Sequence, residues 1–457
     1  MDAILLEDNP HWLKPASEVY THYTDREMLS TALTYLSAKE ILAIIGARRV
    51  GKSSLTKLMI KHLLQEVNPK NIFFINLEKP SFIPYKNDPT YLEKIYDAYL
   101  KLANPNKDEK IYFFIDEIQI FDSWEVFVKS KYENANIKFI ITGSNASLLA
   151  SSYATLLTGR VLKLELRSFN FREFLGYLEI AHSSALERAK NRIEIKQALD
   201  SYLKWGGYYS VFSNQNEQLK VALLKNIAED IILKDIVPRY SIKNSEAIRD
   251  LFFYVVSNAT TQLNYSRLAK KIGIDAKTIK EYIGYFEDNF LIRTIPQYHS
   301  KLTEEINSTK KLYLSDNGFL NLGVNRSENK GAVLENMVFT ALNQEKLRYL
   351  LDGKECDFYL DEKLYQVSYD IEDEKTAKRE FEGLRYFAEK LGHEKGYLIS
   401  YDKDEKRTYE GIEIEVMSID DFLLYLNTKK EAYEINKALH KVKEGKTNDI
   451  GKLFDSL

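Results

Sequence analysis

The chain has 457 residues, 44% hydrophobic and 29% charged, with a formal net charge of −3, so its length favours about two to four domains and its charge excludes a protein that coats nucleic acid by bulk electrostatics. No uninterrupted apolar run is long enough to cross a bilayer, and the N-terminus lacks the basic start and apolar core of a secretory signal. Cys356 is the only cysteine, which excludes an intramolecular disulfide, and we expect a cytoplasmic protein without a membrane segment.

An irregular arm is expected over residues 1–37, and strand-like and helix-like segments then alternate through residue 167. The strand-like runs are Ile41–Ile45, Ile72–Asn76, Ile111–Ile115 and Ile137–Thr142, and the amphipathic runs are Ser53–Glu66, Thr90–Leu102 and Trp124–Tyr132. Such alternation predicts an α/β fold in which helices cover both faces of a parallel sheet. Ligands of these sheets bind beyond the carboxyl ends of the strands.

A phosphate-loop pattern, G-x-x-x-x-G-K-[ST], follows the first strand at Gly46-Ala-Arg-Arg-Val-Gly-Lys-Ser53. Its backbone N–H groups and the positive end of the next helix suit the phosphates of ATP. We expect Lys52 at the β- and γ-phosphates and Ser53 at Mg²⁺, the alternative being an ordinary glycine-rich turn. The residues predicted to bind the nucleotide are Gly46, Arg48, Arg49, Val50, Gly51, Lys52, Ser53 and Ser54.

Two adjacent carboxylates end the apolar run Ile111–Ile115, a pattern typical of a Walker B strand. Asp116 is predicted to hold the Mg²⁺ shell, and Glu117 to orient or deprotonate the attacking water. The alternative is a pair of solvated acids at a strand end.

Small polar residues end the next strand, where Thr142 leads into Gly143-Ser-Asn145. Either Ser144 or Asn145 is placed to sense the γ-phosphate, and the sequence does not choose between them. A Gly-Ser-Asn turn without a ligand is the alternative.

Helical patterns fill residues 168–243, which we interpret as a helical lid. The helix-like runs are Phe169–Leu178, Ala185–Leu203 and Leu219–Val237, and Gly206-Gly207 between them predicts a tight interhelical turn.

A helix-turn-helix spacing occupies residues 244–300. The predicted helices are Ile248–Ser257, Ser266–Ile272 and one capped by Asp275 that runs to Phe286, and a wing strand follows near Leu291–Pro296. The basic residues predicted to contact DNA are Arg267, Lys270, Lys271, Lys277 and Lys280. The alternatives are a protein-binding module and an ordinary solvated face.

Several motifs occur in one order along the chain: Arg48-Arg49, Asp116-Glu117, Thr142-Gly-Ser144, Thr158-Gly-Arg160, Leu166-Arg-Ser-Phe-Asn-Phe-Arg-Glu-Phe and Gly206-Gly-Tyr208. This series resembles the archaeal and bacterial AAA-type ATPases that carry a C-terminal domain of unknown function. The resemblance implies a P-loop ATPase core at residues 38–167, then the lid and a winged helix, a nuclease-like α/β domain at 301–427 and a helical tail at 428–457. We expect a homo-oligomeric ring, for which a hexamer is one candidate arrangement.

Arg160 takes a candidate role from the same resemblance. An arginine near this point in related ATPases reaches the γ-phosphate, in its own subunit or across an interface. A structural salt bridge is the alternative reading of Arg160.

The C-terminal segment resembles the restriction-endonuclease type of core. Glu335 and Asp357 match its acidic positions, whereas Gln366 stands where a second carboxylate belongs and Ser368 stands where lysine belongs. A neutral amide is a poor ligand for a hard divalent ion. We therefore expect a degenerate nuclease site that binds without cutting, unless another group rescues it.

The leading hypothesis is a DNA-stimulated ATPase that uses ATP and Mg²⁺ to translocate or remodel DNA. A nucleotide-dependent regulatory switch that acts through protein partners is the alternative. A nucleotide-gated nuclease is disfavoured by Gln366 and Ser368.

Overall fold

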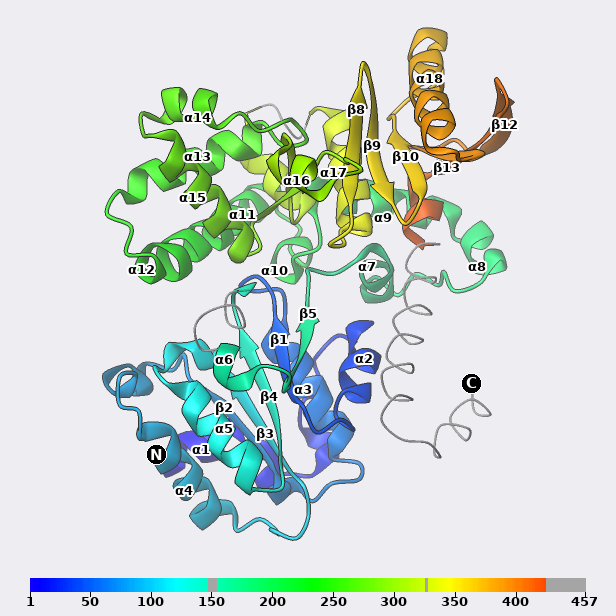
Figure 1. Cartoon of the computed structure of the whole chain (residues 1–457). Coiled ribbons are helices and arrows are strands. Elements are labelled where there is room, and N and C mark those ends of the chain that lie inside the picture. The colour runs from blue at the N-terminus through cyan, green and yellow to red at the C-terminus, as the bar shows by residue number, and fades with distance from the viewer. Residues whose placement is uncertain (147–153, 325–327, 425–457) are drawn as a thin grey trace.

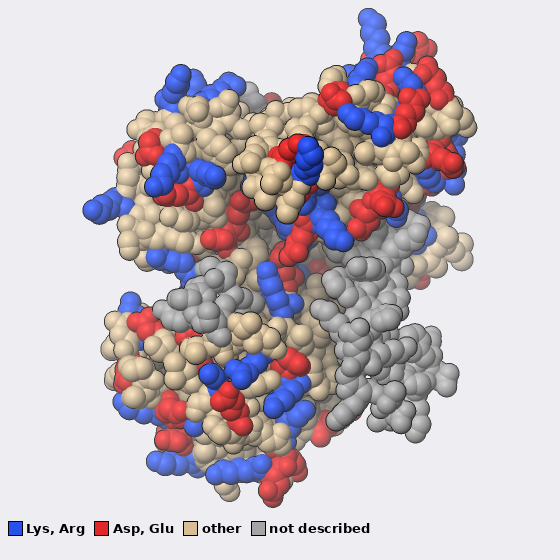
Figure 2. Space-filling view, in the orientation of Figure 1, with Lys and Arg blue, Asp and Glu red and all other residues tan. Residues whose placement is uncertain are grey.

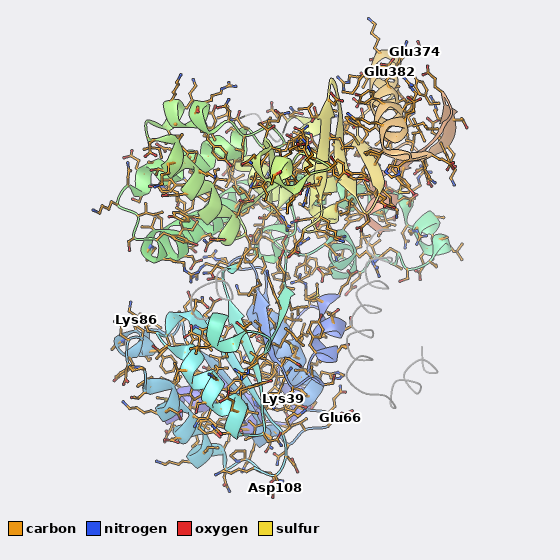
Figure 3. All side chains as sticks on the ribbon, in the orientation of Figure 1. Lys39, Glu66, Lys86, Asp108, Glu374 and Glu382 are labelled. Carbon is orange, nitrogen blue, oxygen red and sulfur yellow. The ribbon has the colours of Figure 1, made fainter. Side chains whose placement is uncertain are left out.

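The computed structural model describes residues 1–146, 154–324 and 328–424. Figure 1 shows a lower body built from the N-terminal third and an upper body of helices and a second sheet. Exposed charged side chains such as Lys86, Asp108 and Glu374 point outward at the periphery of the two bodies (Figure 3). The helical tail expected at residues 428–457 lies outside the described residues.

The lower body is a parallel sheet in the order β2-β3-β4-β1-β5. Its strands are β1 (Ile41–Ile45), β2 (Ile72–Asn76), β3 (Ile111–Asp116), β4 (Ile137–Gly143) and β5 (Val161–Glu165). Alternate residues of β1 belong to two different apolar cores, Leu42 to one and Ala43 to the other. Both faces are therefore covered, which confirms the predicted α/β class.

Among the described residues of segment 38–167, four helices of the lower body pack around this sheet. They are α3 (Lys52–Leu63), α4 (Tyr91–Ala103), α5 (Trp124–Asn134) and α6 (Ala154–Leu157), and short turns join them: η3 (Pro69–Asn71), η4 (Pro80–Tyr85) and η5 (Ile118–Ile120). The first three helices match the amphipathic runs read from the sequence to within a few residues at each end, the usual uncertainty of helix boundaries.

The sequence suggested an irregular N-terminal arm, and this prediction is wrong. It contains α1 (Asp2–Asp8), the turns η1 (Pro10–Trp12) and η2 (Ala16–Glu18), and α2 (Met28–Thr34). The Asn9 side chain donates to Phe74 O at 2.8 Å and accepts from Phe74 N at 2.7 Å, so it pairs with the open edge of β2. The arm covers an edge strand through side-chain hydrogen bonds, which leave no periodic pattern in the sequence.

The predicted lid residues form the helical part of the upper body. Its elements are α7 (Phe171–Tyr177), α8 (Ala185–Lys190), α9 (Arg192–Trp205), α10 (Tyr209–Phe212), α11 (Glu217–Asp230), the π-helical segment η7 (Ile231–Ile236) and α12 (Val237–Arg239). The continuous helix expected over Ala185–Leu203 is instead broken at Asn191, which ends α8 and precedes α9. The run expected over Leu219–Val237 contains a π-helical segment that its periodicity did not indicate.

Gly207 lies where the lid meets the C-terminal half of the chain. A Cβ atom at this position would lie 2.0 Å from the carbonyl oxygen of Phe169. Its N–H donates to Asp316 Oδ2 at 2.9 Å, and Ser168 Oγ donates to the same oxygen at 2.6 Å. Close packing therefore requires glycine here, and the buried Asp316 carboxylate joins the two segments.

Three capped helices and a two-stranded sheet follow the lid. They are α13 (Ser245–Ser257), α14 (Tyr265–Ile272), α15 (Ala276–Asp288), β6 (Ile292–Pro296) and β7 (Lys310–Leu314), with α16 (Leu302–Asn307) between the strands and η8 (Asn317–Leu322) after them. Asp275 caps α15 by accepting from Thr278 N at 2.9 Å. Strands β6 and β7 pair antiparallel, so this unit extends past residue 300.

A second sheet, in the order β12-β13-β11-β10-β9-β8, ends the described chain. Its elements are α17 (Lys330–Leu342), β8 (Arg348–Asp352), β9 (Lys354–Leu360), β10 (Lys363–Val367), α18 (Glu374–Leu391), β11 (Lys395–Ser400), β12 (Glu405–Tyr409) and β13 (Ile412–Ser418). Leu364 of β10 belongs to the apolar core with α18, and its neighbour Tyr365 belongs to the core with α17. Within the described ranges, no helix is long and apolar enough to span a membrane.

Candidate nucleotide-binding site

The phosphate loop joins the carboxyl end of β1 to α3. A Cβ atom at Gly46 would lie 2.1 Å from Leu166 O, so only glycine fits the start of the loop. The buried Lys52 ammonium donates to Gly46 O and Ala47 O at 3.1 Å each, and it lies 3.3 Å from a carboxylate oxygen of Glu117. The lysine is thus held inside the loop, where bound phosphates would meet it.

Oxygen ligands suited to Mg²⁺ meet at the end of β3. Ser53 Oγ donates to Asp116 Oδ2 at 2.6 Å, and Thr142 Oγ1 donates to Asp116 Oδ1 at 2.6 Å. Burial raises the pKa of Asp116, and the charge of Glu117 raises it further. The hydroxyl and carboxylate oxygens that the sequence assigned to the metal therefore lie together and fit a hard divalent cation. Thr142 was not predicted as a site residue.

Glu117 occupies a left-handed backbone conformation with φ of 55°, which is strained for a residue with a side chain and common at active sites. Its N–H donates to Thr142 Oγ1 at 2.9 Å. Burial opposes ionisation, but the charge of Lys52 and the hydrogen bond from Gln119 hold the pKa of Glu117 below its ordinary value. Their surroundings therefore shift the pKa values of Asp116 and Glu117 in opposite directions.

Ser144 and Asn145 follow β4 and are both buried. Gln119 Nε2 donates to Ser144 Oγ at 3.2 Å and to Glu117 Oε2 at 2.5 Å. Ser144 therefore lies within one hydrogen-bonded bridge of Glu117.

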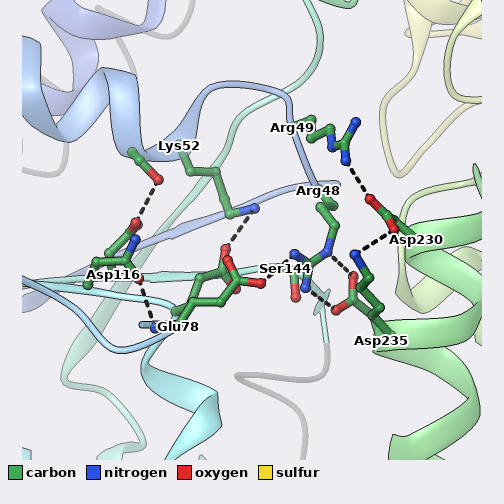
Figure 4. Close-up of polar contacts among 12 residues, drawn as sticks. Arg48, Arg49, Lys52, Glu78, Asp116, Ser144, Asp230 and Asp235 are labelled. Carbon is green, nitrogen blue, oxygen red and sulfur yellow. Dashed lines mark hydrogen bonds and ion pairs between the residues drawn. The ribbon is translucent and has the colours of Figure 1, made fainter. Parts of the chain in front are cut away.

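The two loop arginines contact the lid, as Figure 4 shows. Arg48 donates to Asp235 Oδ1 at 2.7 Å and to Asp235 Oδ2 at 3.0 Å, and also to Glu78 at 2.6 Å. Arg49 donates to Asp230 Oδ2 at 2.5 Å. The guanidinium groups that the sequence assigned to nucleotide binding are here engaged by lid carboxylates.

Asp230 precedes the π-helical segment Ile231–Ile236, and Asp235 is the fifth residue of that segment. A π-helix hydrogen-bonds residue i to residue i+5, so residues five apart lie above one another, whereas in an α-helix they diverge around the axis. The wide turn therefore presents both carboxylates to the loop. Segments of this kind often lie at functional sites.

A buried arginine of the N-terminal arm contacts the phosphate loop at Val50. Arg26 donates to Val50 O at 2.8 Å and to Arg167 O at 2.8 Å, and it pairs with Glu173 at 2.9 Å. Gly51 and Ser54 lie at the beginning of α3. Arg26 was not predicted from the sequence, because its partners are distant along the chain.

Arg160 lies at the wrong end of the sheet to act in its own subunit. Its carbonyl accepts from Ile41 N at 2.8 Å, so it adjoins the amino end of β1, whereas the phosphate loop follows the carboxyl end. Its guanidinium pairs with Glu133 at 3.1 Å. The reading in which Arg160 reaches the γ-phosphate of its own subunit is therefore wrong, and action across an interface stays a prediction.

The basic residues predicted to contact DNA lie on α14 and α15. All five are exposed, and among the described residues none of them has an ion-pair partner: Arg267, Lys270, Lys271, Lys277 and Lys280. The outer surface of this region carries several basic side chains in Figure 2.

The residues of the predicted nuclease-like site come together around an internal lysine. Lys311 of β7 pairs with Glu335 at 3.1 Å, with Asp357 at 3.2 Å and with Glu355 at 2.5 Å. Burial and the charge of Glu335 raise the pKa of Asp357 to about 7, and Lys311 opposes this. No group of three or more His, Cys, Asp or Glu in the described ranges is arranged to hold a metal ion.

Gln366 is also engaged at this place. It donates to Glu380 at 2.7 Å and accepts from the backbone N–H of Asp357 at 3.2 Å. Lys311 and Glu380 were not predicted, because they come from elements outside the expected motif.

Comparisons with known proteins agree with this geometry. Residues 38–175 match the AAA domain family, and residues 196–329 match a domain of unknown function. An uncharacterized protein of Methanocaldococcus jannaschii is 31% identical over 343 residues, which cover 73% of this chain and 72% of that protein. An uncharacterized protein of Haemophilus influenzae is 29% identical over 398 residues, which cover 84% of this chain and 94% of that protein.

Among solved structures, the Aeropyrum pernix ORC1 protein in complex with DNA aligns with a TM-score of 0.31 and 10% identity, over 70% of this chain and 96% of that chain. The match to the AAA domain family and the M. jannaschii relative confirm the resemblance seen in the sequence. The chain belongs to the AAA-type P-loop ATPases.

Proposed function

We propose that this ATPase couples ATP hydrolysis to the translocation or remodelling of DNA. Lys52 is placed to neutralise the β- and γ-phosphates, and Ser53 and Asp116 supply oxygen ligands for Mg²⁺. Glu117 accepts the proton of the attacking water, because its position beside Lys52 and Gln119 keeps it ionised.

The observation that carries the DNA part is the basic surface of α14 and α15. Exposed lysine and arginine side chains without acidic partners are free to contact phosphates, and each contact releases counterions from DNA. The chain as a whole is slightly acidic, with a net charge of −3, so this local surface has to supply the attraction.

We further propose that the working form is a homo-oligomer, a ring in the simplest arrangement. Arg160 lies at the amino edge of the sheet, away from its own phosphate loop. Its side chain is 36% exposed, so it is accessible to a neighbouring subunit's nucleotide.

A second candidate is a nucleotide-dependent switch that acts through a protein partner. The pairs Arg48–Asp235 and Arg49–Asp230 favour it, because they tie the phosphate loop to the lid in the structure described. A bound phosphate would compete for the same guanidinium groups and so bias the position of the lid.

Steady-state ATPase activity with and without duplex, single-stranded and branched DNA tests the proposal. The basic-surface variant Lys277→Ala/Lys280→Ala is compared with a control, Lys61→Ala/Lys107→Ala, whose lysines are exposed on the ATPase body. We expect one DNA form to stimulate wild type and the control, with binding that weakens steeply as salt rises, and the basic-surface variant to lose most of this response. Turnover that no DNA form changes would favour the switch.

A further inference from the structure

Gln119 joins the ends of two strands of the ATPase core, and no sequence motif assigns it a role. It lies in η5, two residues after Glu117. Its Nε2 donates to Glu117 Oε2 at 2.5 Å and to Ser144 Oγ at 3.2 Å. One amide therefore spans the end of β3 and the end of β4.

The orientation of this amide follows from hydrogen-bonding chemistry. An ionised carboxylate only accepts hydrogen bonds, so the nitrogen of Gln119 has to face Glu117. The carbonyl oxygen Oε1 of the same amide is shielded from solvent and accepts no hydrogen bond from the described residues. A buried acceptor of this kind costs free energy unless a donor meets it during function.

Gln119 and Lys52 contact different oxygens of the Glu117 carboxylate. Glu117 has one oxygen beside Lys52 at 3.3 Å and the other beside Gln119 at 2.5 Å. If the lysine moves to the phosphates of ATP, the hydrogen bond from Gln119 to the Glu117 carboxylate remains.

We propose that Gln119 is a further catalytic residue, whose Nε2 holds Glu117 and Ser144 in register and whose Oε1 accepts a hydrogen bond from the attacking water. The water proton passes to Glu117, the water oxygen bonds to the γ-phosphorus, and the bond to the bridging oxygen breaks as ADP leaves with its electron pair. This proposal rests on ATP hydrolysis by the chain, but it does not require DNA.

The test compares wild type with Gln119→Leu, which keeps the size of the side chain and removes both polar atoms. We expect kcat to fall by about 100-fold, in the range typical of a lost positioning or general-base contact. We expect the Kd of a fluorescent ATP analogue to stay within about twofold, because the amide acts on the water and not on the bound phosphates.

The comparison of kcat with nucleotide binding separates a catalytic from a structural role, because loss of a contact to the attacking water lowers kcat and leaves the Kd of the ATP analogue and the melting temperature near their wild-type values. The double variant Gln119→Leu/Ser144→Ala should lose little more activity than Gln119→Leu alone, because the two residues act through one bridge.

A kcat within about threefold of wild type would overturn the proposal. A fall in kcat matched by weaker nucleotide binding and a lower melting temperature would also overturn it, since a structural role alone gives that result. Absence of turnover in wild type would refute hydrolysis itself, and this outcome is seen before any variant is compared.

Discussion

Arg48 and Asp235 form an ion pair with two hydrogen bonds, at 2.7 and 3.0 Å, that joins the phosphate loop to the lid. Paired bonds of this kind fix both distance and orientation. The Arg48 side chain therefore connects the phosphate loop to the segment that leads towards α13, and a nucleotide anion can engage the same guanidinium group instead.

Asp235→Asn should strengthen ATP binding by about threefold to tenfold, because it frees the Arg48 guanidinium from a competing carboxylate. The measurement is the Kd of a fluorescent ATP analogue. Asp250→Asn, at an exposed position of α13, is the matched control and should bind like wild type. Weaker binding by Asp235→Asn would mean that the pair organises the loop for the nucleotide.

Gly207→Ala should destabilise the protein by about 1–3 kcal/mol, because the added methyl group overlaps the backbone of Phe169. Gly284→Ala, in α15, is the control, because a Cβ there meets nothing within 4 Å. Alanine within a helix should add about 0.5–1 kcal/mol of stability at that position. The urea unfolding midpoint should fall in Gly207→Ala and rise in Gly284→Ala. A Gly207→Ala protein as stable as wild type would contradict the close packing described.

The sequence predicted the parts of the site that are contiguous. The phosphate loop and Asp116-Glu117 follow strands directly, so strand order alone brings them to one edge of the sheet. The pair Arg48–Asp235 was not predictable, since its members are 187 residues apart and depend on a π-helical turn with no signature of its own in the hydrophobic pattern.

Distance along the chain also explains why the sequence did not predict the cluster of carboxylates around Lys311. Lys311 reaches Asp357 from β7, 46 residues earlier in the chain, and a motif search looks for lysine only two residues after Gln366. The N-terminal arm was misjudged for a related reason, because Asn9 binds a strand edge through polar atoms and adds nothing to periodicity.

Arg160→Ala and Lys52→Ala are each expected to be nearly inactive, and mixing the two chains should restore part of the turnover. An intact Arg160 on the Lys52→Ala subunit would then serve the intact loop of its neighbour. The measurement is phosphate release at increasing ratios of the two chains. If Arg160→Ala alone keeps wild-type activity, its pairing with Glu133 is only structural.

Lys311→Met should destabilise the protein by about 3–5 kcal/mol, because it leaves buried carboxylates without their cation. The cost should grow with pH. Asp357 has a pKa of about 7 in the folded chain against an ordinary value of 3.8, so the folded state holds the Asp357 proton to a higher pH than the unfolded state does. The free energy of unfolding therefore falls as pH rises between these two values.

Removing Lys311 raises the pKa of Asp357 further and carries this decline to higher pH. Urea unfolding at pH 5 and pH 8 should therefore show a larger loss at pH 8. Equal losses at the two pH values would show that Lys311 acts through packing and not through charge.

The most direct test of the account is ATP hydrolysis by wild type and Glu117→Gln at saturating ATP and Mg²⁺, with nucleotide binding measured in parallel. We expect equal affinity and a kcat lower by about 100-fold to 10,000-fold in the variant, because the amide cannot take the proton of the attacking water. Hydrolysis by Glu117→Gln at the wild-type rate would contradict it.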